Sequence, residues 1–108
     1  MTDNQSILAT LRSLAAANEM RVTQHAQQEM VEEAILLDHA LHVVASGSII
    51  ENYPGHRRGP CCLLHGVDQT GRDLHVVCTT AQPRLIIITV YVPLPPKWMT
   101  PTQRRTTP

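Results

Sequence analysis

Cysteine and histidine side chains gather in the second half of the chain, where they could hold a metal ion. Five side chains of the types that bind zinc lie in two short segments, Cys61-Cys62-x-x-His65 and His75-x-x-Cys78. Neighbouring residues of a strand point to opposite faces, so Cys61 and Cys62 cannot both reach one ion unless the strand bulges. A four-residue turn at residues 68–71 would also place His65 and His75 on opposite faces of the sheet. We therefore expect buried free thiols, with neither a disulfide nor a shared zinc ion.

The remaining histidines, and His75 itself, are candidates for proton transfer. His75 lies in an otherwise apolar strand-like segment, residues 74–78, where burial of a titratable ring costs desolvation energy. A hydrogen-bonded core histidine fits that position as well as a functional one. His25 begins a helical segment, where it is either a base or an anchor for the helix start, and the helix dipole disfavours its protonated form. His39 and His42 lie on the polar side of a helix, and we assign them no role.

Basic and aromatic side chains in predicted loops are suited to contact a phosphate or a base. They are Arg57, Arg58, Arg72, Lys97 and Trp98. Residues 1–51 carry seven acidic and two basic side chains, whereas residues 52–108 carry seven basic and two acidic ones. A polyanion would be attracted to the second half of the chain, unless the two halves neutralise each other in the fold. Sheet topology can bring such separate charges together on one phosphodiester, and solvated loops are the alternative.

The spacing of apolar residues indicates the elements that must position these groups. It predicts three helices, at residues 6–16, 24–33 and 37–46, with Thr23 capping the second and Gly47 ending the third. Four strands joined by short turns follow, at residues 48–53, 61–67, 72–79 and 84–92. The last two are too close in sequence for a crossover, so their pairing is antiparallel. We expect an α+β domain with helices on one face of a mainly antiparallel four-stranded sheet and the other face free for a site.

The composition is that of one folded domain. Of its 108 residues 43% are hydrophobic and 17% charged, which excludes a disordered tail and a low-complexity chain. No apolar run approaches the ~20 residues of a membrane span, and the first residues lack the basic and apolar parts of a signal peptide. Three cysteines cannot all pair. We therefore expect a cytoplasmic protein with reduced thiols and no membrane partner.

Several short motifs, taken in order, resemble a known family. They are Thr23-x-His25-Ala26-x-x-x-Met30, Ile35, Gly47-x-Ile49-Ile50-Glu51-x-Tyr53-Pro54, Cys62-Leu63-Leu64, Gly71-Arg72-x-Leu74-His75-Val76-Val77 and Ile88-Thr89-Val90-Tyr91-x-Pro93. This run, over residues 21–98, resembles a bacterial family of small domains of unknown function placed near the RelE/ParE and BrnT toxins. It implies a RelE-like, toxin-type domain at residues 20–98. An N-terminal helical extension at 1–19 and a flexible tail at 99–108 lie outside it.

The resemblance implies a toxin-like endoribonuclease of a toxin–antitoxin pair that needs no metal or other cofactor. In such enzymes the RNA 2′-hydroxyl attacks its own phosphate, so the protein removes that proton, stabilises the charge on phosphorus and protonates the leaving oxygen. The implied partners are RNA or the ribosome, and an antitoxin protein. The candidate catalytic residues are His75, Tyr91 and His25, and the candidate substrate-binding residues are Arg57, Arg58, Arg72 and Lys97.

The chain also departs from that family. Arginines tend to stand there at the positions of Glu29 and Glu33, and two anions would repel RNA. One alternative is a catalytically inactive RelE-like module that binds a protein through its acidic helical face. Another is a small-ligand or metal sensor on the strands that carry cysteine and histidine. An exposed pocket joining His75, Tyr91 and the arginines would favour the enzyme, whereas a filled sheet face would favour the binding module.

Overall fold

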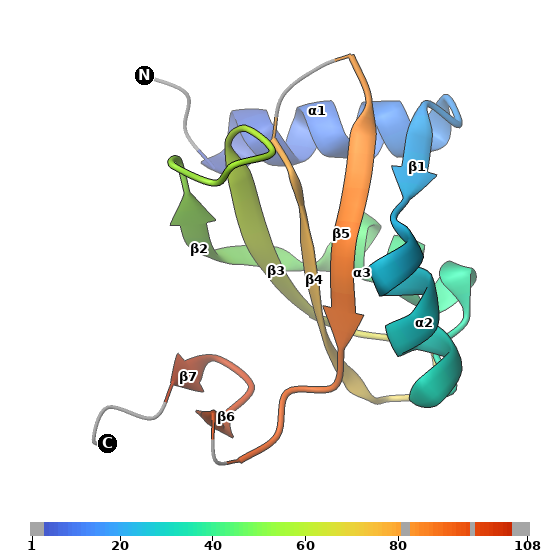
Figure 1. The fold of residues 1–108 in the computed structure, drawn as a ribbon, viewed down its shortest axis with the longest axis vertical. Helices are drawn as coiled ribbons and strands as arrows, with labels where there is room; N and C mark the ends of the chain where they lie inside the picture. The colour runs from blue at the N-terminus through green and yellow to red at the C-terminus, as the bar shows by residue number, and fades with distance from the viewer. Residues whose placement is uncertain (1–3, 81–82, 96, 105–108) are drawn as a thin grey trace.

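The computed structural model describes residues 4–80, 83–95 and 97–104 (Figure 1). The elements of this part of the chain are α1 (Asn4–Ala16), β1 (Met20–Val22), α2 (Gln24–Glu32), α3 (Leu37–Ser46), β2 (Ser48–Tyr53), β3 (Cys61–Val67), β4 (Asp73–Thr79), β5 (Leu85–Tyr91), β6 (Trp98–Thr100) and β7 (Gln103–Arg104). The two predicted helix ends are confirmed. The Thr23 hydroxyl accepts a hydrogen bond from the amide of Ala26 at 3.1 Å, and α3 ends at Gly47. None of the described helices is long and apolar enough to cross a membrane.

Five strands form one sheet in the order β1-β5-β4-β3-β2. β1 runs parallel to β5 and all other neighbours are antiparallel, so the α+β class and the mainly antiparallel sheet are confirmed. The sheet has five strands rather than the predicted four, because Met20–Val22 pairs with β5 over residues 85–87. A three-residue strand is too short for its alternation to be detected in the sequence.

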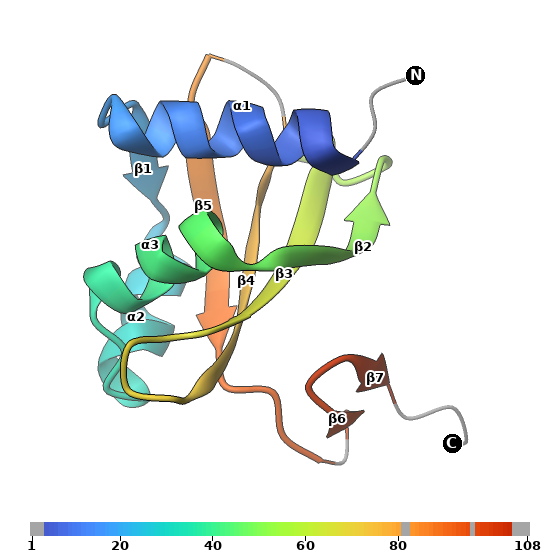
Figure 2. The same cartoon turned by 180° about the vertical axis from the view of Figure 1, so that it is seen from behind.

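The two faces of the sheet are covered differently. α1 and α3 lie across one face, and α2 packs beside β5 and completes the same core (Figure 2). The buried core side chains on this face include Leu11, Val43, Leu64, Val76 and Ile87. We call the opposite face the open face, because none of the three described helices covers it. A smaller apolar cluster lies there, formed by Cys61, Leu63, Val77 and Trp98.

The register between β3 and β4 differs from the expected one. Val67 pairs with Asp73 rather than with Arg72, so His65 lies directly opposite His75 and the two share the open face. The prediction that they lie on opposite faces was therefore wrong. The reason is Gly71, which adopts a positive φ of 88° and adds one residue to the turn between Asp68 and Arg72. A shift of one residue moves every side chain of a strand to the other face.

The end of α3 lies unusually close to β3 beneath His65. A side chain at Gly47 would place its Cβ 2.5 Å from the carbonyl oxygen of His65 and 2.6 Å from that of Val43. Both contacts are with backbone, which cannot move aside without shifting the strand or the helix. Gly47 is therefore required by close approach, and it fixes the strand segment that carries His65.

Residues 98–104 form a hairpin, in which β6 and β7 pair as a second, two-stranded sheet. The sequence predicted a disordered or loosely docked tail from residue 99, because threonine and proline alternate there. In the structure, Trp98, just before this range, is buried against Leu63 and Val77, and residues 103–104 pair with β6, so the hairpin covers part of the open face. Of the predicted tail, residues 105–108 lie outside the described part of the chain.

Candidate functional site

His75 and Tyr91 form a hydrogen-bonded pair on the open face, where they are direct partners on β4 and β5. The Tyr91 hydroxyl lies 3.0 Å from Nδ1 of His75, and the carbonyl oxygen of Pro101 lies 2.5 Å from Nε2. A carbonyl can only accept, so Nε2 carries the proton and Nδ1 accepts the hydrogen bond from Tyr91. Burial lowers the pKa of His75 and raises that of Tyr91. The pair is therefore a neutral imidazole holding a protonated phenol.

The hairpin covers His75 completely. Its exposed fraction is 0%, and the ring of Trp98 lies over it with ring centroids 4.4 Å apart and planes at 88°. Both ring nitrogens already have partners. In this conformation His75 holds Tyr91 and the hairpin in place, and it cannot itself contact a substrate.

His65 and Asp73 form a second hydrogen-bonded pair on the neighbouring strands. Nε2 of His65 lies 2.8 Å from Oδ1 of Asp73, and the His65 and His75 rings are 5.9 Å apart. The side chains of His65 and Asp73 are 18% and 41% exposed, so solvent reaches this pair. The carboxylate accepts, which places the proton on Nε2 and leaves Nδ1 as the basic nitrogen. A histidine oriented by a carboxylate is the usual arrangement of a general base.

A charged network on β2 holds the hairpin. Arg104 donates to both carboxylate oxygens of Glu51, at 2.5 and 2.7 Å, and its guanidinium lies 4.5 Å from the Trp98 ring centroid. The hydrogen bond from Arg104 lowers the pKa of Glu51, and burial with the hydrogen bond to Glu51 raises the pKa of Tyr53 to about 12. The Tyr53 hydroxyl donates to Glu51 at 2.5 Å. These bidentate and aromatic contacts fix Arg104 over the open face.

Glu29 of α2 and Glu33, the residue that ends this helix, position the end of β5 that carries Tyr91. Within the described part of the chain, no strand pairs with the outer edge of β5 beyond Val22, and α2 with its C-cap residue supplies the missing acceptors. Glu29 accepts from the amide of Val90 at 3.0 Å and from the Thr89 hydroxyl, and Glu33 accepts from the amide of Val92 at 2.9 Å. These carboxylates are therefore structural acceptors for the residues on either side of Tyr91.

The core of the chain has the sequence of a known family. It matches a domain of unknown function, DUF4258, over residues 22–92. The chain belongs to the DUF4258 family. No significant match is found among curated proteins or among solved structures. The matched range runs from the last residue of β1 to the residue after β5, so it contains both histidine pairs and excludes the hairpin. A relationship to the RelE/ParE and BrnT toxins stays a prediction.

Of the predicted site residues of this DUF4258 domain, the structure brings three together. His75 and Tyr91 are in contact, and the ammonium of Lys97 lies 6.0 Å from the Tyr91 ring centroid. His25 lies elsewhere, on the exposed surface of α2, with Nε2 3.4 Å from the Glu29 carboxylate. It borders a shallow pocket with three other α2 residues, Gln28, Glu29 and Glu32.

Arg72 binds the protein rather than facing His75. Its guanidinium donates to Asp68 at 3.2 Å, to the carbonyl of Glu33 at 3.0 Å and to that of Ala34 at 3.2 Å. These contacts tie the β3–β4 turn to the end of α2. Burial alone would raise the pKa of Asp68, but hydrogen bonds from Thr70 and Arg72 outweigh it and hold that pKa well below its usual value. The role of Arg72 in this conformation is to anchor the turn.

Arg57 and Arg58 lie in the loop between β2 and β3, at the other end of the sheet from His75. Along β4, His75 and the Thr79 end of the strand are separated by four residues, or about 14 Å. The structure therefore places these two arginines away from the His75–Tyr91 pair.

The three cysteines are free and buried. Cys62 and Cys78 are direct partners on the helix-covered face, whereas Cys61 lies on the open face. The hydrogen bond with Cys62 and burial raise the pKa of Cys78, which keeps it a thiol. Within the described residues no group of three or more His, Cys, Asp and Glu side chains is arranged to hold a metal ion.

From the sequence, His65 was a candidate only as a metal ligand, and Asp73, Glu51 and Arg104 had no predicted role in a site. The glycine at position 71 is the signal that could have indicated a turn longer by one residue. With that turn, the alternation of side chains along the strands would have placed His65 on the same face as His75. No local pattern marks Arg104, because it reaches Glu51 from a segment 53 residues further along the chain.

Proposed function

We propose that this DUF4258 domain is a metal-independent endoribonuclease that cleaves RNA through attack of a 2′-hydroxyl on the adjacent phosphate. One observation carries the proposal. Two hydrogen-bonded pairs able to move protons, His65–Asp73 and His75–Tyr91, lie side by side on one sheet face, with the two imidazole rings 5.9 Å apart. Apolar side chains would fill this face at a lower desolvation cost than these histidines and Tyr91 do. The presence of polar side chains at these positions therefore supports a functional role for them.

The pairs differ in the way that the reaction requires. Nδ1 of His65, with Asp73 on the other nitrogen, accepts the proton of the 2′-hydroxyl as the 2′-oxygen bonds to phosphorus. Tyr91 keeps its proton at neutral pH, because burial raises its pKa, and it donates that proton to the departing 5′-oxygen as the phosphorus–oxygen bond breaks. The two backbones are two strand spacings apart, about 10 Å, so the base and the acid flank a phosphate between them.

Lys97 and His75 complete this arrangement. The Lys97 ammonium, close to Tyr91, is suited to stabilise the negative charge that grows on the phosphate oxygens. His75 is a positioning residue that fixes the direction of the Tyr91 hydroxyl through its Nδ1. Trp98 packs edge-to-face against His75, whose strand β4 lies between β3 and β5, the strands of the two reacting groups. One phosphate therefore contacts both groups only after the hairpin has moved, and its displacement is part of the proposal.

The finer expectations from the sequence belong to the same proposal. They are a RelE-like architecture, RNA or the ribosome as a partner, a place in the cytoplasm and pairing with an antitoxin. The mainly antiparallel sheet with its open face supports the first of these. An antitoxin that bound the open face would keep RNA from His65 and Tyr91.

The test measures RNA cleavage by the full chain in EDTA, with and without ribosomes, and maps the new ends. We expect 2′,3′-cyclic phosphate ends and no cleavage at a position made 2′-deoxy. His65→Ala and Tyr91→Phe should each lower the rate by ~10²-fold or more. His42→Ala, an exchange remote from both pairs, is the matched control and should leave the rate unchanged. Cleavage of the 2′-deoxy position, or cleavage that requires a divalent metal, would contradict the mechanism.

The role of His75 needs a separate comparison. The Gln side chain can accept from Tyr91 and donate to Pro101, whereas Phe can do neither. His75→Gln should therefore keep most of the cleavage rate of the natural chain, whereas His75→Phe should lower that rate by ~10²-fold. A purely structural role would instead make the two rates follow the stabilities of the variants.

The burial of His75 favours a second candidate function, the non-catalytic binding module. The hairpin fills the open face with Trp98, and both nitrogens of His75 are occupied. Trp98→Ala removes the cover over His75. If neither the natural chain nor this variant cleaves any RNA, with or without ribosomes, the module replaces the enzyme.

A further inference from the structure

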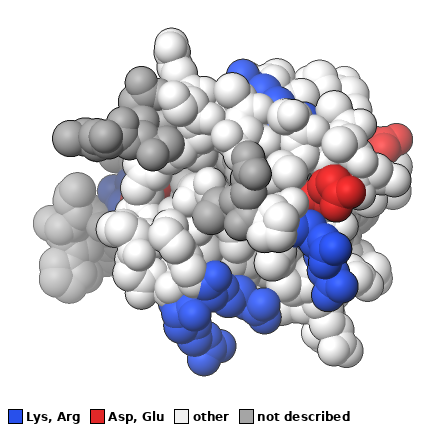
Figure 3. Space-filling view, turned by 90° about the horizontal axis from the view of Figure 1, so that it is seen from above, with Lys and Arg blue, Asp and Glu red and all other residues white. Residues whose placement is uncertain are grey.

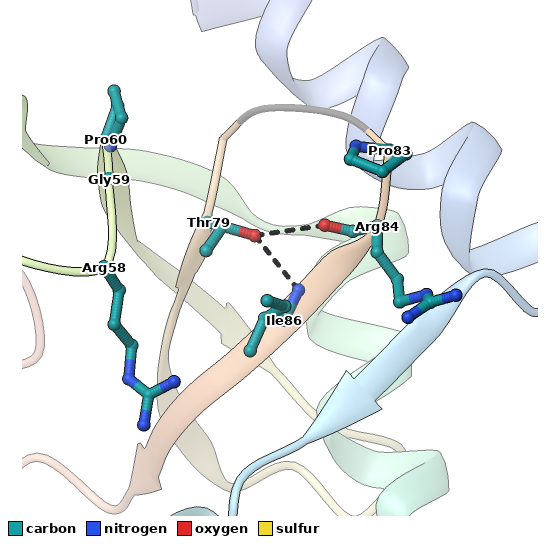
Figure 4. A pocket seen from close by; sticks show the side chains of 7 residues that line it. All are labelled: Arg58, Gly59, Pro60, Thr79, Pro83, Arg84 and Ile86. Atoms are coloured by element: carbon teal, nitrogen blue, oxygen red, sulfur yellow. Dashed lines mark hydrogen bonds between the residues drawn. The ribbon is translucent and has the colours of Figure 1, made fainter.

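The open face has a second feature, at the end of the sheet opposite the histidine pairs. Three arginines border two adjoining pockets there, which share Arg58 and Ile86. The first pocket, of about 160 Å³, also contacts Arg84, and the second, of about 290 Å³, also contacts Arg21. In Figure 4 the side chains of Arg58 and Arg84 lie on either side of Ile86. We call this feature the arginine groove.

The cations of the arginine groove are not neutralised. Arg21, Arg58 and Arg84 are exposed. Within residues 4–80, 83–95 and 97–104, their guanidinium groups form no hydrogen bond or ion pair, and neither pocket is lined by a carboxylate. Arg72 and Arg104, by contrast, are each bound to an acidic side chain. Figure 3, which looks onto this end of the molecule, shows Lys and Arg atoms gathered along its lower edge.

The surroundings of these cations suit a phosphate chain. The start of α2, at Thr23 and Gln24, borders the second pocket, and the free amides of a helix N-terminus attract anions. Ile86 gives the groove a half-buried apolar floor on which a ribose or a base can pack. Guanidinium groups bind phosphate through two parallel hydrogen bonds.

We propose that the arginine groove binds the sugar–phosphate backbone of a single-stranded nucleic acid. The three cations border two adjoining pockets instead of converging on one point, which fits a ligand with successive phosphates better than a single phosphate ion. The groove lies about 10 to 14 Å along the strands from the His65–His75 pair, so its phosphates are not the one that is cleaved. The proposal goes beyond the proposed function, because binding here requires no cleavage.

The experiment measures binding of a fluorescently labelled single-stranded oligoribonucleotide by anisotropy, over a range of salt concentrations. It uses the full chain carrying His65→Ala, so that the result does not depend on cleavage. Arg21→Gln, Arg58→Gln and Arg84→Gln should each weaken binding several-fold. Each should also lower the slope of log affinity against log salt by about 0.7, the value for one phosphate contact on a single strand.

Arg57→Gln is the matched control. Arg57 is exposed and adjacent to Arg58 in sequence, but it lines neither pocket, and its exchange removes the same charge. It should leave the salt slope unchanged. Equal effects of Arg57→Gln and Arg58→Gln would show diffuse attraction instead of a site and would overturn the proposal.

Two further ligands identify what is recognised. An oligomer with an uncharged methylphosphonate backbone should not bind, and binding equal to that of the charged strand would overturn the proposal. DNA of the same sequence should bind as tightly as RNA if the phosphates alone are recognised, and a preference for RNA would add a contact to the 2′-hydroxyl. Retained binding together with no cleavage by the natural chain would refute only the proposed ribonuclease. Cleavage by the natural chain together with binding that is insensitive to the three arginine exchanges would refute only the groove.

Discussion

Leu63 and Leu64 are neighbours on β3 and both are 0% exposed, yet they lie on opposite faces of the sheet and belong to different apolar clusters. Leu64 faces the helices and the main core, whereas Leu63 faces the hairpin and the small cluster around Trp98. The helix-covered face is apolar throughout its centre. The open face mixes apolar groups with His65, His75 and Tyr91, whose polar atoms all need partners.

This contrast shows that the same degree of burial arises in two ways. On the helix-covered face, burial comes from layers that the apolar pattern itself specifies. On the open face, it depends on a seven-residue hairpin held by Glu51, Arg104 and the Pro101 carbonyl. A cover of that size, fixed by a few polar contacts, can separate from the sheet while the main core stays intact.

The largest expected effect compares the two leucines directly. Leu64→Ala should lower the free energy of unfolding by about 2–5 kcal/mol, because the surrounding helices and strands cannot close the cavity. Leu63→Ala should cost less, because the hairpin can settle into the space. Urea unfolding of both variants measures this difference. A cost for Leu63→Ala equal to or above that of Leu64→Ala would mean that the two faces form one rigid core.

A smaller effect concerns the pH dependence of the open face. Burial lowers the pKa of His75 in the fold below its unfolded value of about 6.5. The unfolded chain therefore binds more protons below pH 6.5, and the free energy of unfolding falls as the pH is lowered from there toward the folded pKa. The fall from this one group is at most about 1.4 kcal/mol per pH unit.

Unfolding of the natural chain between pH 5 and 8 checks this dependence against two variants. His75→Phe should flatten the curve below pH 6.5, and His42→Ala should leave its slope in place. An undiminished slope in His75→Phe would assign the dependence to other titratable groups.

The helix-covered face was predictable from the sequence because its determinants are local. Thr23 and Gly47 mark helix ends by their own chemistry, and apolar spacing fixes which residues of α1 and α3 face the sheet. The open face was predicted only in part. The pairing of His75 with Tyr91 followed from their strands, but the partner of His65 depended on the conformation of Gly71. The docking of Trp98 and Arg104 depends on tertiary contacts with distant residues, which no short pattern records.

The smallest expected effect lies where the helical layer reaches the open face. Glu29 accepts from the Val90 amide beside Tyr91, and Glu29→Gln keeps an acceptor while removing its charge. A hydrogen bond to a neutral acceptor contributes about 1 kcal/mol less than one to a charged acceptor, so the free energy of unfolding should fall by roughly that amount. Glu32→Gln is the matched control, since Glu32 lies on the same helix and is exposed, and it should change stability by less than about 0.5 kcal/mol.

Amide hydrogen exchange at Val90 and Val92 tests whether the loss of stability comes from the Glu29 hydrogen bond itself. Exchange should quicken at Val90 in Glu29→Gln and stay unchanged at Val92, whose acceptor is Glu33. Equal quickening at both amides would mean that α2 holds β5 as one unit and not through separate carboxylates.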